Sequence, residues 1–117
     1  MATSILVVHD DPIICIALKN ILNGEGHGVV CYQDPHHALP TLSTIHFDLV
    51  IMNLLNAFML GGQFSLEVKR IYPTMPVLMI SNSTPTGTHG ADKIISGQFT
   101  HDEIVSAVNE LLKSKTP

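Results

Sequence analysis

Short runs of apolar residues recur along this chain, and each run ends at polar or turn-forming residues. We predict strands at residues 4–8, 28–32, 47–52, 76–80 and 93–96. Residues 49–52 are apolar without a break, which is typical of a strand buried on both faces of a parallel sheet. The run stops at Asn53, a polar residue at the end of the strand, where ligands and chemistry collect in open parallel sheets.

Two helices in the first half of the chain are predicted from their start signals. Asp11 with Pro12, and Asp34 with Pro35, each have the form of an acidic N-cap followed by proline at the first helical position. Pro40 falls inside the second of these helices, where it removes a backbone hydrogen bond and clashes with the preceding turn. We therefore expect the second helix to be short, kinked or irregular.

Two further helices are predicted in the second half of the chain. One covers residues 62–72, and its spacing predicts that Phe64, Val68 and Ile71 face inward. The other follows residues 100–103, whose sequence Thr-His-Asp-Glu is a capping box.

Strands that alternate with helices predict an α/β fold with a doubly wound sheet, in a single domain covering residues 1–117. Right-handed crossovers bring the carboxyl ends of the strands to one rim of such a sheet. The residues that we expect to meet at this rim are His9, Asp10, Asn53, Ser81 and Gly97.

The composition narrows the range of partners. The chain is 45% hydrophobic and 14% charged, with a net charge of −4, and it contains no basic block. We therefore expect no direct binding to nucleic acid. No apolar run reaches membrane-spanning length, and we find no signal peptide. Cys15 and Cys31 show no paired spacing, which favours reduced thiols in a cytoplasmic protein. The high apolar content favours a protein partner or a homodimer.

Several of these segments resemble the CheY-like receiver domain of two-component response regulators, and the likeness covers nearly the whole chain. Residues 7–12 resemble the family's first strand with its acidic pair, and residues 48–53 resemble the strand that carries the phospho-accepting aspartate. Ser81 falls at the family's hydroxyl switch position, and residues 90–92 resemble the turn before the fifth strand. The resemblance implies a flavodoxin-like (βα)5 three-layer sandwich with a parallel sheet in the order 2-1-3-4-5.

The residues that carry the family's chemistry differ here. The family transfers a phosphoryl group to an aspartate, with Mg²⁺ held by that aspartate and the first-strand acids and with a lysine after the fifth strand. In this chain Asn53 stands at the phospho-accepting position, His9 replaces the first acid beside Asp10, and Gly97 stands at the lysine position. A neutral amide is not an anionic nucleophile, so we expect no acyl phosphate at Asn53. We expect Mg²⁺ binding through Asp10 to be weak or absent, and no other cofactor.

A second departure lies between Ser81 and Gly90, where the family usually has a helix. The intervening residues are rich in Pro, Gly, Ser and Thr. We predict that the fourth helix is missing or reduced to about one turn.

The leading hypothesis is a degenerate receiver, or pseudo-receiver, in two-component phosphorelay signalling. It would be a non-enzymatic module that binds a protein, such as a histidine kinase or another signalling protein, without being phosphorylated. One alternative is Mg-dependent phosphoryl transfer through another residue, such as His9. Another is a sensor in which His9 and Asp10 bind a transition metal.

Plainer interpretations stay open for the individual residues. His9 would then hydrogen-bond Asp10 or Asn53 and fill the former acidic pocket, and Ser81 would be an ordinary strand-end hydroxyl. A redox role for Cys15 finds no supporting cationic neighbour in the sequence.

Overall fold

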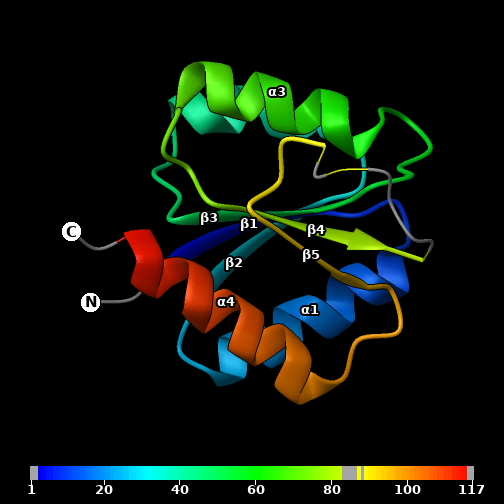
Figure 1. Cartoon of the computed structure of the whole chain (residues 1–117), viewed down its shortest axis with the longest axis vertical. Coiled ribbons are helices and arrows are strands. Elements are labelled where there is room, and N and C mark those ends of the chain that lie inside the picture. The colour runs from blue at the N-terminus through cyan, green and yellow to red at the C-terminus, as the bar shows by residue number, and fades with distance from the viewer. Residues whose placement is uncertain (1–2, 83–86, 88, 116–117) are drawn as a thin grey trace.

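The strands form one parallel sheet in a computed structural model that describes residues 3–82, 87 and 89–115 (Figure 1). Their order across the sheet is β2-β1-β3-β4-β5, the doubly wound order expected from the sequence. The strand bounds are β1 (Ser4–Val8), β2 (Gly28–Tyr32), β3 (Leu49–Asn53), β4 (Val77–Ser81) and β5 (Lys93–Ser96). The β3 strand lies in the middle, so its end is surrounded by neighbouring strands.

Helices cover both faces of the sheet and complete a three-layer, flavodoxin-like sandwich (Figure 1). The helices α1 (Pro12–Gly24) and α4 (His101–Lys115) lie on one face. The other face carries α2 (Pro35–Ala38), the 3₁₀ helix η1 (Leu39–Ser43) and α3 (Gly61–Ile71). Each face has its own apolar core, because successive strand side chains point to opposite faces.

Strands β3 and β4 bury every residue, as predicted for strands covered on both faces. Their bounds are shifted from the prediction. The third strand begins at Leu49 rather than at residue 47, because parallel pairing with β1 starts at Leu49 opposite Ile5. Asn53 and Ser81 are the last residues of their strands rather than the first residues beyond them. The hydrogen bonds between the strands therefore fix the backbone of both residues.

The helix starts confirm the local signals. The Asp11 carboxylate accepts a hydrogen bond of 2.9 Å from the Ile13 N–H, and Asp34 accepts one of 2.9 Å from the His36 N–H. Residues 100–103 form the expected capping box, since each end of the box accepts an N–H from the other. Pro40 has the predicted effect, because α2 stops at Ala38 and the chain continues as the 3₁₀ helix η1.

The inward-facing residues of α3 differ from the prediction at one position. Ile71 was expected to face inward with Phe64 and Val68, but 43% of it is exposed, whereas the other two are fully buried. That expectation was wrong because α3 ends at Ile71, at the edge of the packed layer.

Between β4 and β5, none of the described residues is helical, in keeping with a missing fourth helix. Residues 83–86 and 88, on which that expectation also depends, lie outside the described residues.

Candidate functional site

The rim at the carboxyl ends of the strands encloses a small hollow of about 220 Å³. Of the five predicted site residues, the structure brings four together around it, namely His9, Asp10, Asn53 and Ser81. Gly97 does not line the hollow, and Asn82 does. Gly97 remains next to the rim, because its N–H donates a hydrogen bond of 2.9 Å to the Ser81 carbonyl oxygen.

The centre of the site is a hydrogen bond between two side chains. Asn53 Nδ2 donates to Asp10 Oδ1 at 3.0 Å, and only 7% of Asn53 is exposed. The second oxygen, Asp10 Oδ2, accepts the backbone N–H of Ala57 at 2.8 Å. Each carboxylate oxygen of Asp10 thus faces an N–H donor, and the loop after β3 is tied to the end of β1.

Asn56 is a site residue that the sequence reasoning missed. It is 4% exposed, and its Nδ2 donates to Asn53 Oδ1 at 3.1 Å and to the Gln33 carbonyl oxygen at 3.2 Å. Its own Oδ1 accepts the Phe58 N–H at 2.9 Å. Because Asn56 occupies the oxygen of the Asn53 amide, the Asn53 nitrogen is directed at Asp10. A polar residue placed just after two leucines was the available signal.

His9 stands at the edge of the same hollow, with its side chain 13% exposed. Its Nδ1 accepts the Asp11 N–H at 3.0 Å, so the proton of the neutral ring lies on Nε2. The nearest oxygen of Asp10 is 3.6 Å from Nδ1, too far for a hydrogen bond. The expected hydrogen bond to Asp10 or Asn53 is therefore replaced by one from the backbone.

Burial lowers the pKa of His9 below its usual value of 6.5, although the negative charges of Asp10 and Asp11 oppose that shift. The pKa therefore favours a neutral imidazole at pH 7.

The space beside Gly97 is already occupied. A Cβ atom built at position 97 would overlap the side-chain amide of Asn82. Lys93 lies at the opposite end of β5, where its Nζ donates to Glu110 Oε2 at 2.9 Å. As expected from the sequence, Lys93 is directed away from the rim.

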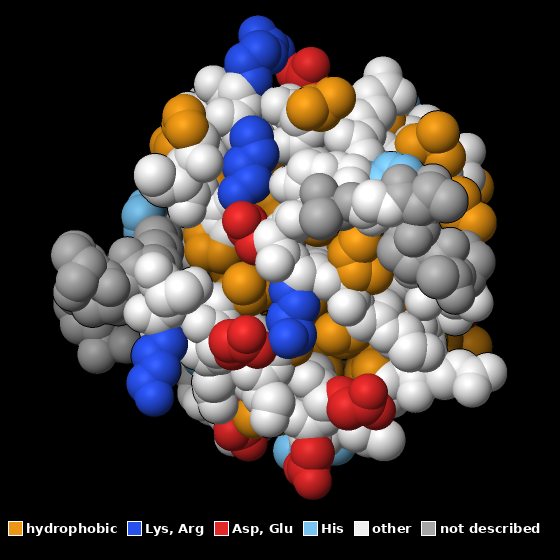
Figure 2. All heavy atoms as spheres, in the orientation of Figure 1, with side chains coloured by type: hydrophobic (Ala, Val, Ile, Leu, Met, Phe, Trp, Pro, Cys, Tyr) orange, Lys and Arg blue, Asp and Glu red, His pale blue; other side chains and the backbone are white. Residues whose placement is uncertain are grey.

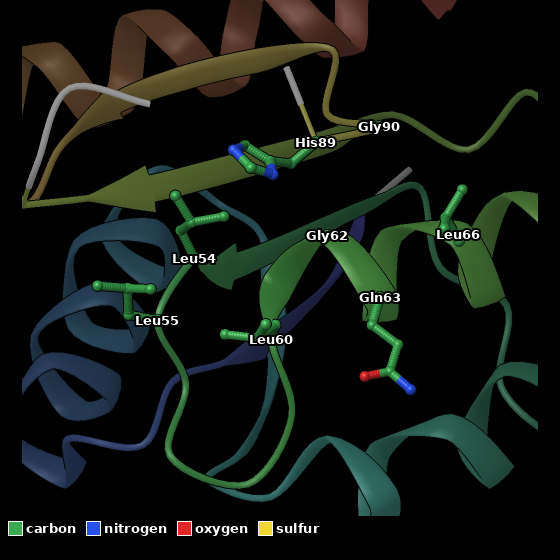
Figure 3. Close-up of a pocket in the computed structure, with 8 residues that line it drawn as sticks. All are labelled: Leu54, Leu55, Leu60, Gly62, Gln63, Leu66, His89 and Gly90. Atoms are coloured by element: carbon green, nitrogen blue, oxygen red, sulfur yellow. The ribbon is translucent and has the colours of Figure 1, made fainter. Parts of the chain in front are cut away.

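A larger, apolar hollow of about 540 Å³ adjoins the rim (Figure 3). Leu54 and Leu55, which directly follow Asn53, form one wall, and Leu60 and Leu66 reach it from the α3 side (Figure 3). Leu55, Leu60 and Leu66 are 65%, 57% and 68% exposed. His89 faces the start of α3 across this hollow. A Cβ at Gly62 would come within 3.2 Å of His89 Cβ, so the glycine allows this close approach.

Charged side chains do not gather into a basic patch on the face seen in Figure 2, where acidic and basic groups are interspersed. Two of the lysines form ion pairs, Lys69 with Asp92 at 2.7 Å and Lys93 with Glu110 at 2.9 Å. In the part of the chain that the structure describes, no cluster of three or more potential metal ligands is found. Within the same residues, no helix is long and apolar enough to cross a membrane.

Comparison with known proteins places this geometry in a family. The model of the response regulator receiver domain matches residues 5–109. The DNA-binding response regulator MtrA of Mycolicibacterium smegmatis is 30% identical over 97% of this chain and 52% of its own length. The transcriptional regulatory protein GlrR of Escherichia coli is 28% identical over 97% of this chain and 27% of its own length. The chain thus spans about half, or about a quarter, of these relatives.

Solved structures agree on the fold. A CheY-like receiver domain protein from Methanospirillum hungatei superimposes with a TM-score of 0.92 at 21% identity, covering 98% of this chain and 97% of the other. A signal receiver domain from Pseudomonas fluorescens gives 0.91 at 19% identity, with 98% of each chain covered. With a sheet in the order 2-1-3-4-5, polar residues gathered at the strand ends and a family match over most of its length, this chain belongs to the response regulator receiver domains of two-component signalling.

Proposed function

We propose that this receiver domain acts as a protein-interaction module that is not phosphorylated at position 53. The observation that carries the proposal is the hydrogen bond of 3.0 Å from Asn53 Nδ2 to Asp10 Oδ1. An aspartate at position 53 would face Asp10 as a second negative charge, which a cation would have to balance. The amide supplies a neutral donor instead, so the pocket is held together without a metal ion.

The residues present do not fit Mg²⁺, the ion that receiver domains use. Mg²⁺ needs oxygen ligands in near-octahedral array. Both Asp10 oxygens already accept N–H groups, from Asn53 and Ala57. Asp11 Oδ1 caps α1 through the Ile13 N–H. An entering Mg²⁺ would have to break these hydrogen bonds and would find one carboxylate at the hollow's centre.

The residues around Gly97, at the end of β5, support the same proposal. A phosphoryl group needs cationic or N–H partners to offset its negative charge. Gly97 supplies no side chain, the Asn82 amide fills the adjacent space, and Lys93 is paired with Glu110. Among the residues that the structure describes, no lysine side chain is therefore placed at the rim as the family's lysine is.

The exposed leucines beside the rim support a protein partner. Leu55, Leu60 and Leu66 line a hollow whose walls are almost entirely apolar, and such surfaces are typical of protein-binding sites. We propose a histidine kinase or another signalling protein as the partner. DNA binding belongs to the name of the longer relative MtrA, and the net charge of −4 argues against direct DNA contact by this chain.

Acetyl phosphate with Mg²⁺ provides the decisive test. Intact-protein mass spectrometry should show no added phosphoryl group, whereas a phosphorylatable receiver domain in the same tube confirms that the reagent is active. The matched variant Asn53→Asp restores a carboxylate nucleophile but leaves Gly97 in place. Labelling of this variant would attribute the lack of phosphorylation to position 53, whereas no labelling would attribute it to the rest of the rim, including Gly97. Robust labelling of the natural chain would refute the proposal.

The same experiment distinguishes the alternative of phosphoryl transfer through His9. Any label would be mapped by peptide sequencing, and loss of that label in His9→Gln would favour the alternative. Two-dimensional amide NMR with Mg²⁺ and beryllofluoride provides an independent readout. The peaks of Asp10, Asn53 and Ser81 should stay in place if the pocket does not bind the phosphoryl mimic.

A further inference from the structure

The fold brings together two cysteines whose spacing in the sequence gave no sign of a pair. Cys15 is buried in α1, and Cys31 lies partly buried on β2, on the same face of the sheet. The Cys31 thiol donates to the carbonyl oxygen of Cys15 at 3.5 Å, and the two side chains are close enough for each to shift the pKa of the other. Neither cysteine is in a disulfide.

We propose that Cys31 is a modification site for hydroperoxides and that Cys15 resolves the oxidised product into an intramolecular disulfide. This role is independent of any phosphoryl chemistry at the rim. Its geometric basis is that a strand at the sheet edge carries the more accessible thiol, while the helix above it carries the buried one. Once the Cys31 sulfur is oxidised, the Cys15 thiol is therefore close enough to react with it.

The two thiols differ in acidity. A favourable interaction with the Cys15 side chain and the positive charge of Lys19 lower the pKa of Cys31 to about 7, against its usual 9.0, although burial opposes the shift. The interaction with Cys31 and burial raise the pKa of Cys15. Lys19 is a cationic neighbour that the sequence analysis did not identify, and it acts on Cys31 rather than on Cys15.

The lower pKa raises the reactivity of Cys31 by a predictable amount. At pH 7 a thiol with a pKa of about 7 is half thiolate, which is roughly fifty times the fraction for a pKa of 9.0. A less basic thiolate is also a weaker nucleophile, which leaves a net gain of roughly 5- to 10-fold in rate.

The reaction balances in two steps. The Cys31 thiolate attacks the distal oxygen of a hydroperoxide ROOH, the O–O bond breaks, and the alkoxide leaves as ROH after taking a proton. The Cys15 thiol then attacks the Cys31 sulfur, the S–O bond of the sulfenic acid breaks, and water leaves with the Cys15 proton. In total, two thiols lose two protons and two electrons, and the peroxide is reduced to ROH and water.

Oxidation of the two cysteines would change the hydrogen bonds of His9 at the rim. The Cys15 thiol donates to the His9 carbonyl oxygen at 3.1 Å, and the His9 N–H donates to the Tyr32 carbonyl oxygen at 3.0 Å. Disulfide formation removes the first of these hydrogen bonds, because Cys15 loses its proton. His9 is therefore the rim residue whose amide signal should move.

The test uses the full chain, reduced and then treated with hydrogen peroxide. The expected product has lost the mass of two hydrogen atoms, stays monomeric on a non-reducing gel, and yields one peptide that links Cys15 to Cys31. In Cys15→Ser, dimedone should trap a sulfenic acid on Cys31. Retention of both thiols, or crosslinked dimers alone, would overturn the proposal.

A second measurement keeps the proposal testable if the cysteine variants fold poorly. In the wild-type chain, alkylation of Cys31 by iodoacetamide should rise with a midpoint near pH 7. Lys19→Gln, a change at an exposed residue, should raise that midpoint and slow alkylation at pH 7. A midpoint near the usual 9.0 in both proteins would show that Cys31 is an ordinary thiol and overturn the proposal.

Discussion

The interior of the sheet and its rim are separated by a few residues of the same strands, yet they are held by different forces. Residues 49–52 of β3 are at most 1% exposed, and their side chains belong to the two apolar cores. At Asn53 the side-chain contacts become hydrogen bonds, and Leu55 is already 65% exposed. The interior stabilises the fold through burial, whereas a few hydrogen bonds determine what the rim can bind.

This difference explains how the fold could persist if residues at the rim were substituted. Apolar burial is non-directional and depends on area, so many sequences build the same interior. The TM-score of 0.92 at 21% identity is an instance of that tolerance. Chemistry at the rim depends on individual donors, acceptors and charges, so single substitutions can alter it.

The largest expected effect separates interior from surface on one helix. Phe64 is fully buried, and Phe64→Ala should lower the free energy of unfolding by about 3–5 kcal/mol, through lost burial and the cavity left behind. Leu66 on the same helix is 68% exposed, and Leu66→Ala should change it by less than about 0.5 kcal/mol. Urea denaturation measures both, and equal losses would contradict the assigned packing of α3.

A smaller effect is expected at the centre of the rim. Asn53→Asp replaces a hydrogen bond to Asp10 with a pair of like charges, which should cost about 1–3 kcal/mol of stability at pH 7. Mg²⁺ should recover part of that loss, because it offsets the repulsion. Asn53→Ala is the matched control, since it loses the hydrogen bond without adding a charge and should not respond to Mg²⁺. Thermal melts with and without Mg²⁺ measure the stability of each variant. An Asn53→Asp variant whose melting temperature does not change with Mg²⁺ would refute this account.

The pH dependence of stability tests the burial of His9. Because the folded-state pKa of His9 lies below 6.5, the unfolded chain binds the proton first as the pH falls. The contribution of His9 to stability is therefore complete above pH 6.5 and decreases below it, by at most about 1.4 kcal/mol for each unit by which the pKa is lowered. His9→Gln should be less sensitive to pH between 7 and 5 than the wild type, by urea denaturation at each pH. Identical pH profiles would show that His9 is not the group responsible.

The smallest effect is expected at Gly97. Gly97→Ala places a Cβ against the Asn82 amide, but Asn82 is exposed and its side chain can rotate away, so the cost should stay below about 1 kcal/mol. In an Asn82→Ala background, that cost should vanish. A double-mutant cycle measures the coupling, and a cost that persists without the Asn82 side chain would place the strain elsewhere.

Much of the fold was predictable from local signals. The bounds of β1, β2 and β5 match the apolar runs, and both Asp-Pro helix starts and the capping box at residues 100–103 form as predicted. The predictions that were wrong depend on neighbours rather than on local sequence. The start of β3 is set by pairing with β1, and the exposure of Ile71 is set by where the packed layer ends.

The site was predictable only in part. The ends of the strands identified His9, Asp10, Asn53 and Ser81, because parallel strands present their carboxyl ends at one edge. Asn56 and Asn82 were missed because their importance depends on hydrogen-bond geometry and on close contact with Gly97.

By itself, the sequence determined the order of strands and helices, the buried centre of the sheet and the presence of an amide at position 53 and a glycine at position 97. These follow from apolar spacing and residue identity, which act locally along the chain. Only the tertiary structure decided that Asn53 donates to Asp10, that Asn56 orients this amide and that Cys15 lies beside Cys31. Hydrogen bonds and thiol acidity depend on distance and direction, and folding alone brings these distant residues together.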